Sequence, residues 1–257
     1  MPRKQRIEVC FTPAVYHKFH NNETNVVVVD ILRATSAICT AFMNGVKSII
    51  PVSTVEEASL YKKQGYLVAA ERDGIVLDFA DFGNSPYNFT PERVKGKTIV
   101  YSTTNGTQAV NMAKEANKIL IGSFLNIKSI TDFLTSDGHD VVVFCSGWKD
   151  RFSLEDSIFA GALVESLINT NHFETICDSS LAAGDLWSIA KTDLVSYLQK
   201  AAQRSRLKKN NLDDVIEYCL TLNQTDIIPI YNNGSLIALD NCENDNIFIQ
   251  RKIKLNN

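Results

Sequence analysis

The hydrophobic positions of this chain form short, uninterrupted runs that alternate with stretches of helical spacing. The clearest run is residues 26–29, which are four consecutive valines. Because successive side chains of a strand point to opposite faces, an all-apolar strand is buried on both sides, as in a largely parallel sheet. Ile38, Ala41 and Phe42 then follow at the spacing of a helix that ends near Gly45. The pattern predicts a buried strand, a short polar turn and a helix.

The same alternation continues to about residue 170. Further strands are predicted at 7–11, 48–52, 67–70, 98–101, 118–121 and 140–144. Helices are predicted at 54–64, 108–116, from 126 onward and at 157–167. The turn-rich segment 78–91 has neither period and is predicted to be a loop. This order of elements is typical of an α/β fold with three layers, α/β/α, around a mixed, mostly parallel central sheet.

The pattern weakens beyond residue 175. Helical spacing is present at 181–203 and 212–222, an extended segment is expected at 226–229, and terminal strands are expected at 236–253 after the turn at 232–234. The sequence contains no long linker, repeat or low-complexity tract. We therefore expect a single α/β domain over residues 1–257, whose helical part at about 175–225 is either integral to it or a cap.

Polar residues follow the predicted valine strand at once. Asp30 stands where that strand should end, and the carboxyl ends of strands are where ligands collect in open α/β sheets. Arg33, Thr35 and Ser36 come next, at the predicted start of a helix, where free backbone N–H groups attract anions. A simple N-cap and a turn-holding acid would give the same residues. The planar guanidinium of Arg33 favours the interpretation as an anion site.

Other predicted strands also end in polar or small residues. These candidate ligand-binding positions are Glu71 and Arg72, Asn84 and Ser85, Thr103, Thr104, Asn105, Gly106 and Thr107, Ser146 and Gly147, and Glu155 and Asp156. A glycine among hydroxyls lets a backbone approach a multi-oxygen anion closely, although a capped turn has the same composition. The nucleotide-binding P-loop pattern is absent. Glu155 and Asp156 could hold magnesium, or could simply start a helix together with Ser153.

Composition excludes several classes of function. The 257 residues carry 26 Lys and Arg against 29 Asp and Glu, a net charge of −3, which gives no support to nucleic-acid binding. The short basic run 204–209 is interpreted as a solvated helix end. No stretch is apolar enough to span a membrane or act as a signal peptide, and the six cysteines show no metal-binding spacing. We expect a cytoplasmic protein with reduced thiols.

Acids for a metal ion, arginines and hydroxyls for an oxyanion, and no nucleotide loop together favour hydrolysis of a phosphoryl group. The motifs also resemble those of the 2-phosphosulfolactate phosphatases, the magnesium-dependent phosphatases of coenzyme M and sulfolactate biosynthesis. The matching motifs, in order, are VDILRATS at 29–36, ER at 71–72, GNSP at 83–86, TTNGT at 103–107, FSLED at 152–156 and IIP at 227–229. The sequence departs from the expected motifs at Ala70, where a glycine is expected, and at the bulky, charged segment 148–151.

The resemblance implies a magnesium-dependent hydrolysis of 2-phosphosulfolactate to 3-sulfolactate and phosphate. We expect Asp30, Arg33, Glu71 and Arg72 to be catalytic, and Asp30, Glu71 and Glu155 or Asp156 to hold Mg²⁺. A small phosphorylated sulfonate is the expected ligand, and a homodimer is left open as the assembly.

The nucleophile is left open between water, Asp30 and Cys145. The Asp-x-Asp pattern of one large phosphatase class is missing because Leu32 takes the place of the second acid, which favours water. Cys145 and Arg151 have the spacing of cysteine phosphatases but lack the glycine-rich segment between them. Two alternative functions are a phosphatase for another small phosphorylated acid and a non-catalytic binding module for sulfonates or phosphates.

Overall fold

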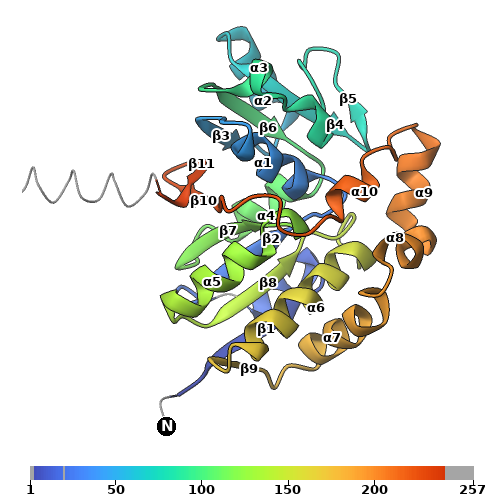
Figure 1. The fold of residues 1–257 in the computed structure, drawn as a ribbon. Coiled ribbons are helices and arrows are strands. Elements are labelled where there is room, and N and C mark those ends of the chain that lie inside the picture. The colour runs from blue at the N-terminus through green and yellow to red at the C-terminus, as the bar shows by residue number, and fades with distance from the viewer. Residues whose placement is uncertain (1–2, 20, 241–257) are drawn as a thin grey trace, which may run out of the picture.

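The computed structural model describes residues 3–19 and 21–240, which form a central sheet flanked by helices (Figure 1). The strands are β1 (Gln5–Cys10), β2 (Asn25–Val29), β3 (Ser48–Pro51), β4 (Leu67–Arg72), β5 (Ile75–Val76), β6 (Thr98–Ser102), β7 (Lys118–Gly122), β8 (Val141–Cys145), β9 (Phe173–Glu174), β10 (Pro229–Asn232) and β11 (Ser235–Ala238). Each strand predicted before residue 170 is present. The fold is the predicted three-layer α/β arrangement with a mixed, mostly parallel sheet.

Helices occupy most of the segments between the strands. They are α1 (Ala34–Met43), α2 (Val55–Lys63), α3 (Pro91–Val94), α4 (Gly106–Met112), α5 (Ile127–Asp137), α6 (Leu154–Asn169), α7 (Asp178–Ala190), α8 (Leu194–Tyr197), α9 (Ala202–Lys209) and α10 (Ile216–Cys219). Short 3-10 helices are η1 (Pro13–Lys18), η2 (Pro86–Asn88), η3 (Phe124–Asn126) and η4 (Leu198–Lys200). The predicted cap of α2 is confirmed, since the Thr54 hydroxyl accepts a hydrogen bond from the Glu57 N–H at 3.1 Å.

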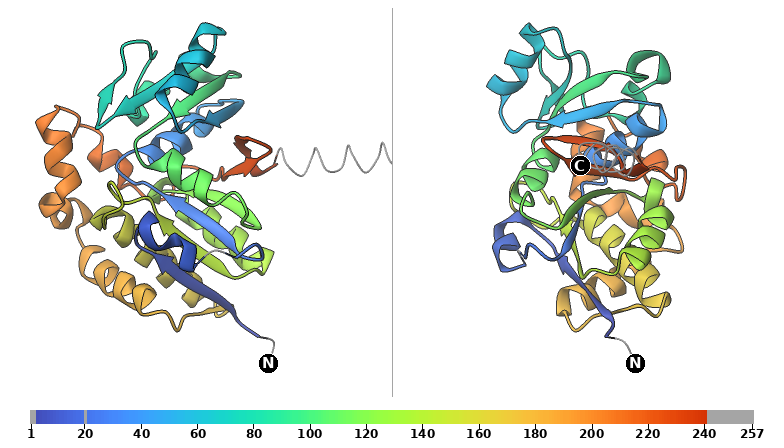
Figure 2. Two further views of the ribbon diagram at one scale, coloured as in Figure 1. Left: turned by 180° about the vertical axis from the view of Figure 1, so that it is seen from behind. Right: turned by 90° about the vertical axis from the view of Figure 1, so that its left-hand side faces the viewer.

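The sheet consists of two parallel groups joined by a hairpin. Its order is β5-β4-β6-β3-β11-β10-β7-β2-β8-β1-β9. Strands β4, β6 and β3 are mutually parallel, as are β7, β2, β8, β1 and β9. The C-terminal hairpin β10–β11 pairs antiparallel with β7 on one side and with β3 on the other. Figure 2 shows the two groups as the upper and lower parts of the molecule.

The valine strand is buried on both faces, as predicted. Val27 and Val29 belong to a core formed with α5, α6 and α7, whereas Val26 and Val28 belong to a second core that includes α1 and α4. All four side chains are at most 2% exposed. Burying a valine contributes about 1.5–3 kcal/mol, so this strand anchors both layers and fixes the position of Asp30 at its end.

The helical prediction beyond residue 175 was only partly right. The segment predicted as one helix at 181–203 is divided into α7, α8, η4 and α9. The division occurs at Asp193, whose side chain accepts a hydrogen bond from the Ser196 N–H and so caps a new helix. Within 212–222, only α10 is an α-helix. These breaks bend the chain so that α9 reaches the carboxyl ends of the parallel strands (Figures 1 and 2).

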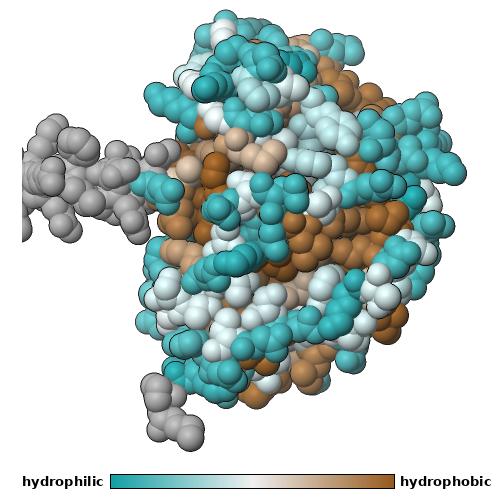
Figure 3. All heavy atoms as spheres, viewed as in Figure 1, coloured by the Kyte–Doolittle hydropathy of each residue, from teal (hydrophilic) through white to brown (hydrophobic). Residues whose placement is uncertain are grey.

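Strands flank the turn at 232–234, as predicted, although the predicted strand positions 239 and 240 are not part of a strand. The hairpin ends at Ala238, and the predicted strand positions 241–253 lie outside the described residues. None of the helices in residues 3–19 and 21–240 is long and apolar enough to cross a membrane. Apolar side chains form a band across the middle of the face shown in Figure 3, where α10 and the chain leading to β10 lie.

Candidate active site

The carboxyl ends of β2 and β4 meet the turn after β6 and the loop after β8 in one small pocket. Five predicted site residues line it: Asp30, Arg33, Glu71, Asn84 and Asn105. Its free volume is about 30 Å³, which has room for only one or two water molecules. The sequence motifs therefore converge on a single, nearly closed site.

Asp30 is held by the turn between β2 and α1. Its backbone N–H donates to the Thr35 hydroxyl at 3.1 Å, and its carbonyl accepts from the Thr35 N–H at 2.9 Å. One carboxylate oxygen accepts only a long bond, 3.3 Å, from the Ala34 N–H. The Ser36 hydroxyl donates to the Ile31 carbonyl at 2.9 Å. The hydroxyls of Thr35 and Ser36 thus stabilise the turn, and the carboxylate of Asp30 keeps most of its acceptor capacity.

Arg33 is the buried cation of the pocket. It is only 4% exposed, and its Nη2 donates to the Asn84 Oδ1 at 2.7 Å. Its Nη1 is buried and has no hydrogen-bond partner in the described part of the chain. Burial lowers the pKa of Arg33 from its usual value. Because an unpaired buried donor is costly, this guanidinium is suited to bind an anion from the pocket.

Three buried acids, Glu71, Glu155 and Asp156, lie near the half-buried Asp30. Burial, together with the charges of Glu71 and Glu155, raises the pKa of Asp30 to about 7, although the Ala34 N–H and Arg33 oppose the shift. Burial likewise raises the pKa of Glu155, and burial together with Glu155 and Asp30 raises the pKa of Asp156 well above its usual value. Mutual repulsion of this kind is relieved by a proton or by a cation.

Glu71 and Asp156 have both carboxylate oxygens engaged. Glu71 accepts from the Gly74 N–H at 2.6 Å and from the Thr104 N–H at 2.9 Å, which joins β4 to the turn after β6. Asp156 accepts from the Ile31 N–H at 2.8 Å and from the Gly147 N–H at 3.2 Å. Each acid therefore ties two strand ends together. Asp156, in the first turn of α6, thus connects this helix to the residues that follow β2 and β8.

The predicted turn at 103–107 lies against Asp30. A Cβ added to Gly106 would be 3.3 Å from the Asp30 Oδ2 and 3.0 Å from the Ala34 Cβ, so only glycine leaves this approach free. The Thr107 hydroxyl donates to the Thr103 carbonyl at 3.1 Å, and the Thr103 hydroxyl accepts from the Thr107 N–H. The predicted anion-binding turn is thus a closed turn whose glycine packs on the acid.

Ser146 and Gly147 follow β8 on the other side of Asp30. The Ser146 N–H donates to the Val29 carbonyl at 2.8 Å, which continues the pairing of β8 with β2. The Ser146 hydroxyl is fully buried and has no hydrogen-bond partner among the described residues. Gly147 has a φ of +61°, and a Cβ there would collide with the Arg151 carbonyl. The Ser146 hydroxyl is a second unused polar group close to the strand end that carries Asp30.

Some predicted residues lie outside the pocket lining. The Arg72 guanidinium donates to the Glu71 carbonyl at 2.6 Å and to the Ser102 hydroxyl at 2.9 Å, so it braces strands instead of facing the pocket. Ser85 precedes η2 and does not line the pocket, unlike its neighbour Asn84. Cys145 is buried, and burial raises the pKa of its thiol well above the usual value, which disfavours a thiolate nucleophile.

Helix α9 contributes side chains to the pocket that the sequence patterns did not predict. Gln203, Arg206 and Leu207 from this helix, with Asn210 after it, line the pocket opposite Asp30. The run 204–209 was interpreted as solvated, which holds for Lys208 and Lys209 but is wrong for Arg206. The signal that could have identified it is the helical spacing of Gln203, Arg206 and Leu207 within that basic run, which places them on one face.

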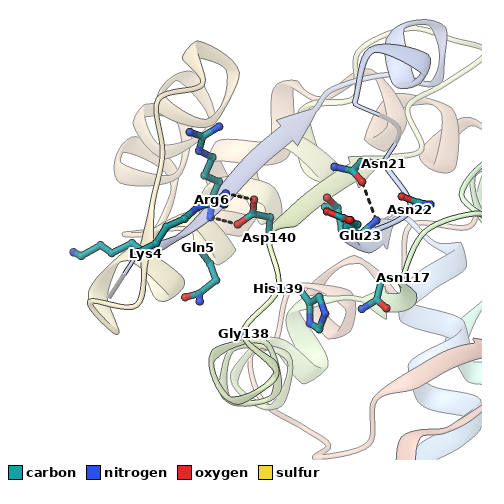
Figure 4. Close-up of a pocket in the computed structure, with 12 residues that line it drawn as sticks. Lys4, Gln5, Arg6, Asn21, Asn22, Glu23, Asn117, Gly138, His139 and Asp140 are labelled. Carbon is teal, nitrogen blue, oxygen red and sulfur yellow. Dashed lines mark hydrogen bonds and ion pairs between the residues drawn. The ribbon is translucent and has the colours of Figure 1, made fainter. Parts of the chain in front are cut away.

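A larger hollow lies at the opposite edge of the sheet, at the amino ends of the parallel strands (Figure 4). Its volume is about 730 Å³. Arg3 and Asp140, two of its charged residues, are paired: Arg3 donates to the Asp140 Oδ2 at 3.0 Å, and the other Asp140 oxygen accepts from the Arg6 backbone N–H at 2.8 Å. Arg3 is also well exposed, at 71%. This hollow lacks the buried, unpaired groups of the small pocket.

Comparison with known proteins identifies the family. Residues 10–234 match the family model described as 2-phosphosulpholactate phosphatase. The chain belongs to this family. Three relatives, each named probable 2-phosphosulfolactate phosphatase, come from Caldanaerobacter subterraneus, Clostridium novyi and Thermotoga maritima; they are 38%, 37% and 36% identical to this chain. The aligned regions cover 82%, 80% and 82% of this chain and 89%, 88% and 90% of the relatives.

In this 2-phosphosulfolactate phosphatase family member, the fit of magnesium to the pocket depends on which carboxylates keep free acceptor capacity. The described residues contain no group of three His, Cys, Asp or Glu side chains close enough to form a metal cage. Magnesium, however, usually takes one or two protein carboxylates, with water and substrate phosphate completing its shell. Asp30 lines the pocket with free acceptor capacity and has repelling acids around it. It fits such a partial site, whereas Glu71 and Asp156 are already bonded to backbone N–H groups.

Proposed function

We propose that this protein hydrolyses the phosphate monoester of 2-phosphosulfolactate, giving 3-sulfolactate and inorganic phosphate, with Mg²⁺ bound at Asp30. Membership of the family and the names of the relatives support the reaction. The observation that carries the proposal is the pairing of a buried arginine, whose Nη1 lacks a partner in the described chain, with a carboxylate cluster in one pocket.

Binding of the phosphate falls to Arg33, which lines the pocket. A phosphoryl group placed against Arg33 would accept the unused Nη1 N–H and remove the cost of a buried unpaired donor. Asn84 fixes the guanidinium through its bond to Nη2, so the donor is oriented before the substrate arrives.

Hydrolysis requires a water oxygen to attack phosphorus while the bond from phosphorus to the ester oxygen breaks. The proton of the water passes to a carboxylate, and Asp30 is the acid of the cluster that faces the pocket with spare acceptor capacity. Arg33 stabilises the negative charge on the phosphoryl oxygens. The leaving alkoxide of sulfolactate takes up a proton and is released as the alcohol.

Magnesium, when bound, would supply positive charge to the phosphoryl oxygens and make water a stronger acid. Asp30 would hold it, and Glu155 stands near enough to Asp30 to raise its pKa. Glu71 and Asp156 would keep the surrounding strand ends in place. Of the four acids expected from the sequence to hold magnesium, the proposal thus keeps Asp30 as the ligand and gives Glu71, Glu155 and Asp156 supporting roles.

The test is phosphate release from 2-phosphosulfolactate, with magnesium and with the metal chelated, beside 2-phospholactate, phosphoglycolate and p-nitrophenyl phosphate. Magnesium-dependent turnover that prefers the sulfonate supports the proposal. Equal turnover of all four esters would point to a general phosphatase for small acids. Tight binding of sulfolactate without release of phosphate from any ester would replace the enzyme with a binding protein.

A further inference from the structure

Helix α9 closes the pocket from the side opposite the sheet. The Gln203 Nε2 donates to the Leu32 carbonyl at 2.8 Å, which joins the helix to the residue directly before Arg33. Leu207 is buried beneath the helix, and Asn210 lies close to Gly74 at the end of β4. In Figure 1 the helix is at the right-hand side, beside the ends of the parallel strands. The free volume of about 30 Å³ is too small for a substrate, so side chains that line the pocket, those of α9 among them, must move when one binds.

Arg206 is the cation that α9 brings to this pocket. Its Nε donates to the Gln203 Oε1 at 2.7 Å, and its guanidinium carbon lies 4.3 Å from the centre of the Trp148 ring. These contacts hold the guanidinium plane by its edge and its face. Within the described chain its two terminal nitrogens make no hydrogen bond. A half-buried, oriented guanidinium with free N–H groups is thus presented to the pocket.

We propose that Arg206 recognises the sulfonate of the substrate, and that α9 is the lid that carries it; this inference rests on the proposed phosphatase function. The substrate has anionic groups besides the phosphate. Arg33, in the floor of the pocket beside Asp30, serves the phosphate, so a second arginine in the same pocket serves another anion. Arg206 lies in α9, whereas Arg33 lies directly before α1. The phosphate and the second anion are therefore bound by different parts of the fold.

A sulfonate suits Arg206 better than a carboxylate does. A sulfonate is a weakly basic, weakly hydrated anion with three oxygens, and a guanidinium is a weakly hydrated cation with a planar set of donors. Trp148 covers one face of the guanidinium and keeps water from it. Trp148 lies in the segment 148–151, where the sequence departs from the expected family motif.

A purely supporting role for Arg206 makes a different prediction. Arg206 lies near buried Glu155, whose charge raises the pKa of Arg206 against the effect of burial. If Arg206 only neutralised Glu155 or held the lid shut, its removal would affect all phosphate esters equally. If it binds the sulfonate, its removal affects only substrates that carry one. Substrate selectivity therefore separates the two roles.

The experiment compares Arg206→Gln with Lys209→Gln, which removes the same charge from an exposed position of the same helix. We measure kcat/KM for 2-phosphosulfolactate and for 2-phospholactate, which lacks only the sulfonate. For Arg206→Gln we expect a loss of about 100-fold with the sulfonate and less than about 3-fold without it. Lys209→Gln should change both by less than about 2-fold. Arg206→Lys keeps the positive charge but loses the planar set of donors, so its kcat/KM for 2-phosphosulfolactate should lie between those of Arg206→Gln and wild type. This variant replaces Arg206→Gln in the test if the glutamine variant does not fold.

Equilibrium binding of 3-sulfolactate separates failure of this inference from failure of the proposed function. If wild-type protein binds sulfolactate and Arg206→Gln binds it about 100-fold more weakly, the assignment of Arg206 holds even without turnover. Equal losses with both esters, or unchanged sulfolactate binding by the variant, overturn the assignment while the phosphatase function stands. Wild-type protein that neither binds sulfolactate nor hydrolyses its phosphate ester refutes both.

Discussion

The two edges of the parallel strands carry opposite kinds of hollow. At the amino ends, a space of about 730 Å³ is lined by charges that are exposed or paired, such as Arg3 with Asp140. At the carboxyl ends, a space of about 30 Å³ is lined by the buried Arg33 and Glu71 and by the half-buried Asp30. A paired surface charge costs little to keep, whereas a buried unpaired one is retained only where the fold compensates for it. Burial without pairing, and not volume, marks the chemical site.

Removing one acid at each end of the parallel strands should give the largest difference in activity. Asp30→Asn should reduce kcat for 2-phosphosulfolactate by on the order of 10³-fold, because the pocket loses its available carboxylate. Asp140→Asn, at the opposite hollow, should leave kcat within about 2-fold, since its partners are exposed. Phosphate release measures both variants, and circular dichroism checks their folding. Comparable losses in the two variants would remove the distinction between the edges.

The two arginines give the next largest contrast. Arg33→Met should reduce kcat/KM by about 10²–10³-fold, because a preoriented donor to the phosphoryl group is lost. Its free energy of unfolding should change much less than that of a typical buried-pair deletion, since relief of a buried charge offsets the loss of the Asn84 hydrogen bond. Arg3→Met should change activity by less than about 2-fold. Unfolding in urea and steady-state kinetics give the two readouts; a stable, fully active Arg33→Met protein would contradict the role of Arg33.

The pH dependence of stability sharpens the same contrast for Asp30. Its pKa is 3.8 in an ordinary setting and about 7 in the folded chain, so the unfolded chain loses this proton first as the pH rises. Metal-free protein should therefore lose on the order of a few kcal/mol of stability between about pH 4 and pH 7 from this group alone. Asp30→Asn has no such carboxyl group and does not show this loss. The urea midpoint of the variant relative to that of wild type should therefore be higher at pH 8 than at pH 5.

Added magnesium supplies the control for that measurement. Magnesium binds the ionised carboxylate of the folded chain and so stabilises wild-type protein at pH 8, which should shrink the advantage of the Asp30→Asn variant. If the stability advantage of Asp30→Asn does not depend on pH, Asp30 is not the titrating group. If that advantage grows with magnesium, Asp30 is not the metal ligand.

Sequence patterns predicted the part of the site that local order determines. The valine strand, Asp30 at its end and the turn containing Gly106 are set by short stretches whose burial and conformation follow from their own residues. The pattern could not show that Arg72 braces Ser102 or that Glu71 is bonded by Gly74 and Thr104, because these contacts depend on which strands pair. The sequence gives the sign of each charge, but it does not show which group each charged side chain contacts.

The C-terminal part shows the same limit over longer distances. The hairpin β10–β11 was predicted around its turn at 232–234, yet nothing in its sequence indicates that it lies between β3 and β7 at the centre of the sheet. Arg206 was missed because a basic run on a short helix is usually solvated, and only the bends around α8 and η4 turn one face of α9 toward the pocket.

A smaller effect is expected from crowding the acid without removing it. Gly106→Ala would place a methyl group 3.0 Å from the Ala34 Cβ and 3.3 Å from the Asp30 Oδ2, so the carboxylate must shift by a few tenths of an ångström. We expect a loss of kcat of about 10-fold, since misplacement of a catalytic group is costly. Gly184→Ala in α7 meets no atom within 4 Å and should instead stabilise the fold by roughly 0.5–1 kcal/mol. If both variants keep full activity, close packing of Gly106 on Asp30 is unimportant.

The smallest effect is expected at the cysteine whose spacing to Arg151 suggests a thiol nucleophile. Cys145 is fully buried, burial keeps its pKa well above the usual value, and Arg151 is exposed, so the thiolate and the arginine cradle that such a mechanism needs are both missing. Cys145→Ser should therefore leave kcat within about 2-fold, at the cost of burying a hydroxyl in place of a thiol. A loss above about 100-fold in a variant with unchanged urea midpoint would instead make Cys145 the nucleophile, and would move the chemistry from the Asp30 carboxylate to the end of β8.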